Sequence, residues 1–173
     1  VNAGTEVADT SLPADLRSRI LQAAGPFMNE LHATDEGRVH LDFISPVQVN
    51  HGGQFSGALQ LTVDASVMLY PLLRKWPTPS QSGETLIVRR DGDEVLWLSD
   101  LRRRADAALR IRAPIDSPTL VAARALRGNT SGFMEGTDYD GVPVLAAYRR
   151  LEGTSWRLVA KVDQAEAFAP LRE

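Results

Sequence analysis

The sequence predicts an α+β domain, with one antiparallel sheet of five or six strands and helices packed mainly on one face. Two Asp-Gly pairs, at 91–92 and 140–141, each lie between runs of β-forming residues, which is the strongest local signal for a hairpin. A tight turn at Glu152-Gly153 leads into one more strand, so the last three strands are predicted to be antiparallel. Helical patterns at both ends and between the strands supply the α part.

The composition limits the classes of function. The chain has 173 residues, of which 43% are hydrophobic and 24% are charged, values typical of one globular domain. It contains no cysteine, which excludes disulfides, thiol catalysis and cysteine-ligated zinc. The formal net charge of -3 argues against a nucleic-acid partner. The sequence contains no uninterrupted run of about 18 apolar residues, so no part of this chain is predicted to cross a membrane.

The N-terminal part is predicted to be helical. We expect residues 1–11 to be disordered or foreign to the domain, and a long helix to span 12–34. Ser11 is a suitable N-cap, and Gly25-Pro26 must kink this helix because proline donates no backbone hydrogen bond. The apolar stripe of the helix consists of Leu12, Leu16, Ile20, Phe27, Met28 and Leu31. This stripe could form a homodimer seam as readily as a core face.

The remaining strands and two helices make up a sheet domain, which we place at 37–162. Alternating apolar residues and turn signals predict strands at 39–49, 58–63, 85–90, 94–98, 108–113, 132–139, 142–149 and 156–162. His51-Gly52-Gly53 is the predicted turn between the first two strands. Helices are predicted over 65–76, where Asp64 is the cap, and over 118–126.

A further helix is predicted over 163–173, at the end of the chain. Asp163 is a suitable N-cap, and Glu166 three residues later completes a capping-box pattern. Because the last strand leads directly into this helix, a shift of the sheet would be transmitted to it. The missing initiator methionine and the helical end indicate a segment of a longer protein.

Catalytic and metal sites are not indicated. The three histidines, His32, His40 and His51, share no metal-ligand spacing. Ser56 lies one position too late for the Gly-x-Ser-x-Gly nucleophile motif, so no catalytic residue is predicted. We therefore expect no enzyme, and no haem or flavin, for which no positioned histidine or cysteine is present.

Candidate ligand-binding residues are aromatic, arginine and acidic side chains on or beside the strands. Aromatic side chains combine an apolar wall with a polar group, and an arginine on a covered sheet face needs either an acid or an anionic ligand. The alternative for each candidate is a solvent-facing or internally paired side chain. The predicted ligand-binding set is Tyr70, Arg89, Trp97, Arg110, Arg112, Asp138, Tyr139 and Tyr148.

The last third of the chain carries a hairpin and a strand with a recognisable order of residues. The hairpin is Asp138-Tyr139-Asp140-Gly141-Val142-Pro143-Val144-Leu145, and the strand is Trp156-Arg157-Leu158-Val159. They resemble the D-Y-x-G-x-x-V-L hairpin and the W-x-L-V strand of the extracytoplasmic sensor domains called Cache, or PAS-like, domains. The strand-then-helix unit at 55–76 and the hairpin at 83–92 are similar to the middle of these domains, so the resemblance covers about residues 12–173.

The resemblance implies a periplasmic or extracellular domain of a bacterial inner-membrane receptor, whose membrane contacts lie in flanking segments. Its output would be of the histidine kinase, diguanylate cyclase or chemoreceptor type. It implies a small-molecule pocket between the sheet and the covering segment 98–127, and a ligand that shifts the terminal helices. The arginines favour a small anion such as an organic acid. The alternative is a ligand-free dimerising spacer that senses a partner protein, which a filled interior would favour.

Overall fold

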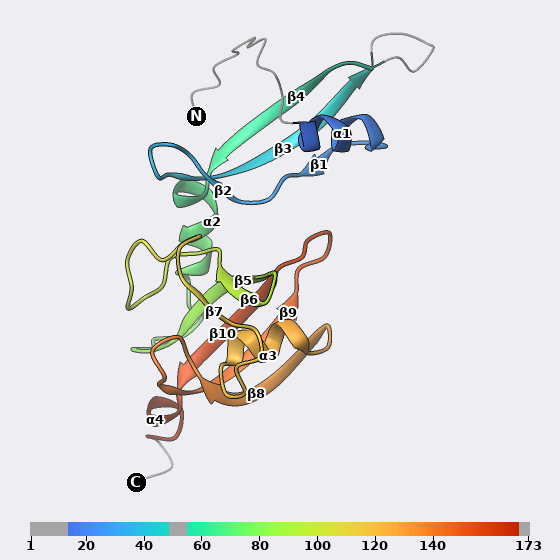
Figure 1. The fold of residues 1–173 in the computed structure, drawn as a ribbon. Helices are drawn as coiled ribbons and strands as arrows, with labels where there is room; N and C mark the ends of the chain where they lie inside the picture. Colours follow the sequence, from blue (N-terminus) through green and yellow to red (C-terminus); the bar gives the residue numbers. More distant parts are fainter. Residues whose placement is uncertain (1–13, 49–54, 170–173) are drawn as a thin grey trace. The chain divides into compact units, whose positions relative to one another are not determined.

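The computed structural model describes residues 14–48 and 55–169. The disorder predicted for 1–11 and the turn predicted at 51–53 lie outside these described residues. Contacts divide the chain into two compact units, the first comprising Val1–Glu30 and Leu41–Val63 and the second comprising Leu31–His40 and Asp64–Glu173 (Figure 1).

In its described residues, the first unit contains one helix and three strands. They are α1 (Ala14–Gln22), β1 (Phe27–Met28), most of β3 (Val39–Gln48) and β4 (Phe55–Asp64). β3 pairs with β4 and also, antiparallel, with β1, where Phe27 lies opposite Ile44. Ile20 of α1 and Ile44 are each only 1% exposed, so both helix and strand contribute buried apolar side chains to this unit.

The prediction of a long helix over 12–34 is wrong beyond Gln22, where α1 ends. The residues that follow form β1 and, in the second unit, β2 (His32–Ala33), and both strands pair antiparallel with β3. Gly25 and Pro26 interrupt helical hydrogen bonding, and strand pairing then decides the conformation of the apolar residues after them. A dimer seam along one continuous helix is therefore not formed.

Six antiparallel strands form the sheet of the second unit, in the order β7-β6-β5-β10-β9-β8 (Figure 1). They are β5 (Glu84–Asp91), β6 (Glu94–Trp97), β7 (Arg112–Pro114), β8 (Ser131–Thr137), β9 (Pro143–Arg150) and β10 (Arg157–Asp163). The predicted five- to six-stranded antiparallel sheet is confirmed, although the strands predicted at 39–49 and 58–63 belong to a separate sheet. Gly92 and Gly141 have φ of +63° and +78° in the two Asp-Gly turns, a conformation that glycine adopts without steric cost.

The core of the second unit lies on one face of this sheet, where α3 (Val121–Arg127) packs. Its strand residues include Leu86, Val88, Val95, Trp97, Val144, Ala146 and Val159. Burying one such large apolar side chain stabilises the fold by about 1.5–3 kcal/mol. The helix predicted over 118–126 is confirmed, although it begins at Val121. Side chains fill the interior between α3 and the sheet.

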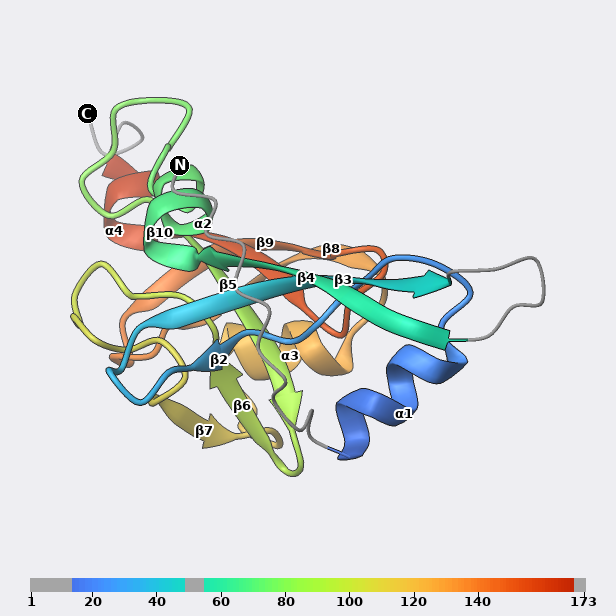
Figure 2. The ribbon, with the colours of Figure 1, turned by 90° about the horizontal axis from the view of Figure 1, so that it is seen from above.

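Two more helices belong to the second unit, α2 (Ala65–Leu73) and α4 (Gln164–Ala167), and the loop 74–83 lies beside α4 (Figure 2). Asp64 caps α2 as predicted, because its carboxylate accepts a hydrogen bond from the Ser66 amide at 2.8 Å. The helix predicted over 163–173 ends at Ala167, before a proline that disfavours helix in the residue preceding it. Residues 170–173 lie outside the description.

The capping box predicted for α4 is not formed, since within the described part of the chain Asp163 makes no side-chain cap hydrogen bond. Glu166, the other member of the predicted box, instead contacts the loop at 80–82. Among the described helices, none has the length and the apolar character needed to span a bilayer.

Candidate functional site

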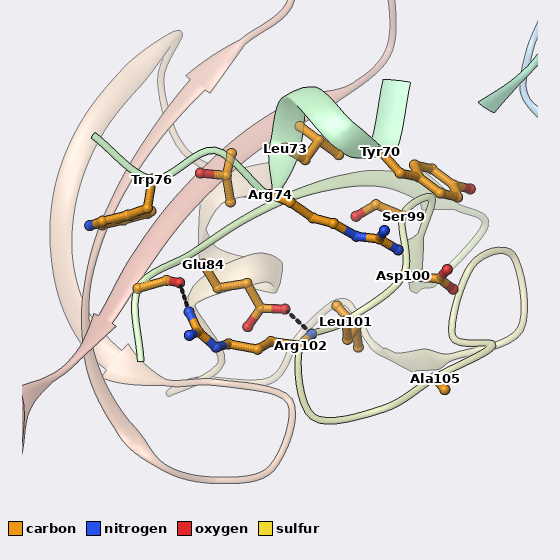
Figure 3. A pocket seen from close by; sticks show the side chains of 12 residues that line it. Tyr70, Leu73, Arg74, Trp76, Glu84, Ser99, Asp100, Leu101, Arg102 and Ala105 are labelled. Carbon is orange, nitrogen blue, oxygen red and sulfur yellow. Dashed lines mark hydrogen bonds between the residues drawn. The ribbon is translucent and has the colours of Figure 1, made fainter. Parts of the chain in front are cut away.

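A pocket of about 440 Å³ lies in the second unit where the end of α2, the start of β5 and the loop after β6 meet (Figure 3). Tyr70, Arg74 and Trp76 line it from α2 and the residues that follow, Glu84 lines it from β5, and the loop contributes several residues of 99–105. An aromatic wall with a few convergent polar groups is the usual composition of a small-molecule site.

Two contacts fix the walls of this pocket. The hydroxyl of Tyr70 donates to the carbonyl oxygen of Leu98 at 2.9 Å, and burial raises the pKa of Tyr70, so the side chain stays neutral. On the opposite side, Gly83 leaves room for the indole of Trp76, because a Cβ at position 83 would lie 2.6 Å from the Trp76 ring. The sequence therefore needs glycine at this point of the wall.

Glu84 and Arg102 connect the pocket to the neighbouring backbone. One carboxylate oxygen of Glu84 accepts from the amide of Arg102 at 2.6 Å. The guanidinium of Arg102 donates in turn to the carbonyl oxygens of Gly83, at 2.6 Å, and Ser80, at 3.4 Å. Both charged groups thus already have protein partners, and they hold the loop after β6 against the start of β5.

Arg74 differs from the other charged residues of the pocket. Its guanidinium forms neither an ion pair nor a hydrogen bond with any described residue, whereas Arg102 donates to two carbonyl oxygens. It extends toward the side of the pocket that Asp100 lines (Figure 3). A guanidinium can hold a carboxylate through two parallel hydrogen bonds. Arg74 is therefore the cation of this pocket that is available to an anionic group of a ligand.

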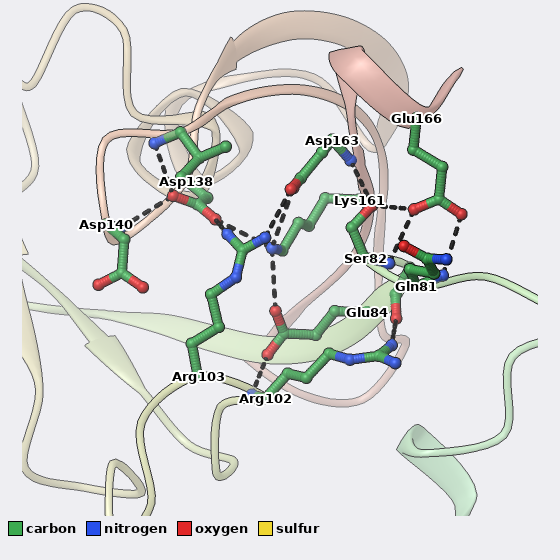
Figure 4. A network of polar contacts seen from close by, with 12 residues as sticks. Gln81, Ser82, Glu84, Arg102, Arg103, Asp138, Asp140, Lys161, Asp163 and Glu166 are labelled. Atoms are coloured by element: carbon green, nitrogen blue, oxygen red, sulfur yellow. Dashed lines mark hydrogen bonds and ion pairs between the residues drawn. The ribbon is translucent and has the colours of Figure 1, made fainter. Parts of the chain in front are cut away.

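A buried ionic cluster lies next to the pocket (Figure 4). This cluster, called the Lys161 network below, consists of Lys161, Glu84, Asp138, Tyr139, Arg103 and Asp163. The Lys161 side chain is 1% exposed, and its ammonium lies 3.1 Å from Glu84 and 2.9 Å from Asp138. Since a buried charge is costly without partners, these carboxylates are what permits a lysine inside the sheet.

Asp138 and Tyr139 hold the start of the second Asp-Gly hairpin in this network. One oxygen of Asp138 accepts from the amides of Asp140 and Val142, at 2.9 and 3.0 Å, and the other accepts from Lys161. Burial works to raise the pKa of Asp138, but these hydrogen bonds and the Lys161 charge outweigh it and lower the pKa. Burial, followed by a hydrogen bond to Glu84, raises the pKa of Tyr139.

The loop after β6 contributes three consecutive arginines, Arg102 to Arg104, and each one has a protein partner. Arg103 bridges two carboxylates, Asp138 at 3.2 Å and Asp163 at 2.5 Å, and the hydrogen bond to Asp163 is the main reason that the pKa of Arg103 is raised. Arg104 donates to Asp140 at 2.7 Å. This basic run therefore joins the loop to the hairpin and to the end of β10.

Glu166 of α4 is held by the loop that leads from α2 to β5. Its carboxylate accepts from the hydroxyl of Ser80 at 2.8 Å and from the amides of Gln81 and Ser82, at 3.0 and 2.8 Å. The Ser82 hydroxyl is a fourth donor. These hydrogen bonds, with those from Ser82 and Ser80 side chains foremost, lower the pKa of Glu166 to about 2.

The structure brings three of the predicted ligand-binding residues near the site. Tyr70 lines the pocket, and Asp138 and Tyr139 belong to the Lys161 network. Tyr70 and Arg110 also line a smaller pocket of about 200 Å³ in the same unit. Both carboxylate oxygens of Asp138 accept hydrogen bonds from protein donors, so this residue holds the hairpin in position.

The other predicted residues lie elsewhere in the second unit. Trp97 is 1% exposed in the core, and its indole nitrogen has no hydrogen-bond partner among the described residues. Tyr148 packs against the same core. Arg89 lies 4.0 Å from the carboxylate of Asp91, and Arg112, on the edge strand β7, lies 2.6 Å from it. These residues are not gathered into one site, and their role in ligand binding stays a prediction.

Sequence reasoning did not place Lys161, Arg74 or Glu166 at the site, and it assigned Glu166 only to a helix cap. For Lys161 a signal was present: it is one of only two lysines among 19 basic residues, and it lies two residues after the buried Val159, so both side chains are on the same face of the strand. For Arg74 and Glu166 no local pattern indicates the contact. Within the described residues, no grouping of three or more His, Asp or Glu side chains is arranged to hold a metal ion.

No protein-family model and no curated protein sequence matches this chain. Solved structures do. The periplasmic sensory domain of the Campylobacter jejuni chemoreceptor Tlp1 matches with a TM-score of 0.65 and 16% identity, over 90% of this chain and 57% of its own. The extracellular domain of mmHK1S-Z3, a predicted histidine kinase, matches with a TM-score of 0.61 and 20% identity, over 86% and 52%.

A third match is the ligand-binding domain of PctC, an amino-acid chemoreceptor of Pseudomonas aeruginosa solved in complex with GABA. Its TM-score is 0.58 at 19% identity, over 94% of this chain and 66% of that domain. This chain thus spans between about half and two thirds of the length of the three solved domains. The Cache-type α+β fold predicted from the sequence is confirmed: the chain has the fold of extracellular and periplasmic sensory domains of chemoreceptors and histidine kinases.

Proposed function

We propose that this chain is an extracytoplasmic ligand-sensing domain of a membrane-bound bacterial signal-transduction protein. One observation carries the proposal: this chain has a pocket of about 440 Å³ with aromatic and charged walls at the start of β5. Its fold is shared with the sensory domain of a chemoreceptor. Residues of 99–105, in the first part of the covering segment 98–127, line the pocket, whereas the α3 part of that segment packs directly on the sheet. The parent protein has a histidine kinase, diguanylate cyclase or chemoreceptor output.

The proposed ligand is a small molecule with a carboxylate group. Arg74 is the anchor for that carboxylate, and Trp76 and Tyr70 provide the wall for its apolar part. Asp100, which also lines the pocket, is placed to accept a hydrogen bond from an ammonium group. GABA, with which the PctC domain was solved in complex, combines these two groups, so amino acids belong in the test set beside organic acids.

The experiment is a ligand screen on the chain with a matched pair of variants. Thermal-shift and calorimetric titrations are run with organic acids, amino acids, amines and purines. Losing a charged bidentate contact should weaken binding of a carboxylate ligand about tenfold or more in Arg74→Ala. Arg149→Ala is the control, since Arg149 is exposed on β9 outside the pocket. Absence of any binder, or a binder that R74A leaves unaffected, refutes the assigned site.

The screen also separates the two classes of sensor. A domain that binds nothing but forms a dimer in light scattering would support the ligand-free spacer. The position of the domain in the parent is tested by a reporter enzyme that is active only outside the cytoplasm, fused behind residue 173 in the full-length gene. Activity of that reporter supports an extracytoplasmic location, and its absence refutes the location.

A further inference from the structure

We propose that Glu166 couples the wall of the pocket to α4. Through this contact, the loop 74–83 and the end of β10 change position together. This inference rests on the proposed function in treating the 440 Å³ pocket as the ligand site. It adds a specific transmitting contact between two segments that lie more than 80 residues apart in the sequence.

The first half of the coupling is the contact between Glu166 and residues 80–82. Four donors of the loop converge on one carboxylate, two of them backbone amides, so the loop backbone itself is held by α4. The Ser82 hydroxyl also accepts from the amide of Asp163, the last residue of β10, at 3.0 Å. Figure 4 shows Glu166 and Asp163 facing the loop from the same side. A displacement of residues 80–82 therefore acts on both the end of β10 and the first turn of α4.

The second half of the coupling leads from residues 80–82 to the pocket. The Ser80 hydroxyl, which donates to Glu166, accepts from the amide of Gly83 at 2.8 Å. Gly83 lines the pocket and is in close contact with Trp76, and its carbonyl oxygen binds Arg102. One hydroxyl thus connects the Glu166 carboxylate to the pocket wall. A ligand that moves the Trp76 indole or the Gly83 peptide changes the geometry of the donors around Glu166.

The contact is fully formed at neutral pH. The pKa of Glu166 is lowered to about 2, so its carboxylate stays ionised at every pH between about 3 and 8. Protonation therefore does not open it under physiological conditions, and what remains to perturb it is movement of the loop. Hydrogen bonds to an ionised acceptor are about twice as strong as neutral ones, which suits a contact that transmits position.

A first experiment reads the pocket wall after the contact is broken. Glu166→Gln removes the charge and replaces one of the two accepting oxygens with an NH2 group, which cannot accept from the two donors on that side. Trp76 reports the wall, because Trp97 and Trp156 are 1% and 3% exposed and poorly accessible to a quencher. Acrylamide quenching of Trp76 fluorescence, assigned with Trp76→Phe, should rise about twofold in E166Q. Glu152→Gln, in the exposed β9–β10 turn, is the matched control.

A second experiment runs in the opposite direction, as the reciprocity of coupling requires. Gly83→Ala introduces a Cβ that would lie 2.6 Å from the Trp76 ring and 2.7 Å from the Ser80 hydroxyl. The displaced wall should speed amide exchange in residues 164–169 about tenfold, as the Glu166 hydrogen bonds weaken. Gly25→Ala is the control, because its Cβ would meet nothing within 4 Å.

Neither experiment needs a ligand, so the outcomes separate this inference from the proposed function. Faster exchange of α4 in G83A together with higher Trp76 quenching in E166Q supports the coupling, whatever the ligand screen finds. If E166Q changes exchange in α4 but leaves Trp76 quenching at the wild-type value, Glu166 only tethers the helix and the coupling is refuted. If G83A is too unstable to measure, the Trp76 quenching of E166Q decides alone.

Discussion

Lys161 and Asp138 form an ion pair of 2.9 Å inside the second unit, with both side chains 1% exposed. Lys161 lies on β10 in the middle of the sheet order, and Asp138 lies at the start of the second Asp-Gly hairpin, 23 residues earlier. Glu84, at the first position of β5, is the second buried partner of the same ammonium, at 3.1 Å. Through these two carboxylates, Lys161 joins β10, β5 and the second Asp-Gly hairpin beside the pocket.

Replacing Lys161 tests how much of the fold depends on this pair. Lys161→Met keeps an unbranched side chain as far as Cε but leaves the carboxylates of Glu84 and Asp138 buried without their cation. Removing one partner of a buried ion pair costs about 3–5 kcal/mol, so the free energy of unfolding in urea should fall by that amount. Lys75→Met is the matched control, because Lys75 is exposed and is the only other lysine. A loss as small as that of the control would contradict the assigned role.

A second prediction concerns the acid sensitivity of Asp138. Its pKa is lowered from the ordinary value of 3.8, so its charged form stabilises the fold at neutral pH, and this contribution is lost as the pH falls below 3.8. Asp138→Asn removes the contribution at every pH. The variant should be less stable at pH 7 and should lose less further stability between about pH 5 and about pH 3. Thermal unfolding against pH measures this, with the exposed Asp116→Asn as control.

The parts of the fold that followed from the sequence depend on local chemistry. The turns at Gly92 and Gly141 were predictable because a tight hairpin requires a positive φ, which glycine adopts freely. The segment after Pro26 was not predictable in the same way, since its apolar residues fit a helical stripe and a strand equally well. Pairing with β3, a contact made later in the chain, decides between them.

The site followed from the sequence only in part, for the same reason. Asp138 and Tyr139 stood out because they adjoin a turn. Lys161 needs partners 23 and 77 residues away, which no local pattern indicates. Glu166 shows the limit most clearly: its spacing from Asp163 fits a capping box, yet its carboxylate binds a loop more than 80 residues earlier.

A third prediction isolates the hydroxyl of Tyr139. This group donates to the second oxygen of Glu84 at 2.8 Å, and a hydrogen bond to a charged acceptor contributes about 1.5–3 kcal/mol. Tyr139→Phe should lower the free energy of unfolding by that amount while the ring stays over Lys161, 5.2 Å from its ammonium. Tyr148→Phe is the control, since the Tyr148 hydroxyl forms no hydrogen bond with another described residue. Equal losses in both variants would show that the hydroxyl of Tyr139 is not specially placed.

The last prediction concerns the approach of α3 to the sheet, which fixes the covered face of the core. The amide of Thr137 on β8 donates to the carbonyl oxygen of Thr119 at 2.8 Å, and between them Gly136 leaves no space: a Cβ there would lie 2.3 Å from that oxygen and 2.8 Å from Val121. The clash involves backbone, which cannot rotate away as a flexible side chain would. Gly136→Ala should therefore cost about 1–3 kcal/mol of unfolding free energy.

Gly57→Ala on β4 is the control for this change, because a Cβ at position 57 would meet nothing within 4 Å. Urea denaturation of both variants, at equal slope against denaturant, compares them directly. If G136A is as stable as G57A, the segment before α3 can move off β8 without loss, and the filled interior is not held closed at this edge. If G136A alone is destabilised, the contact of Thr119 with β8 holds the segment before α3 on the sheet.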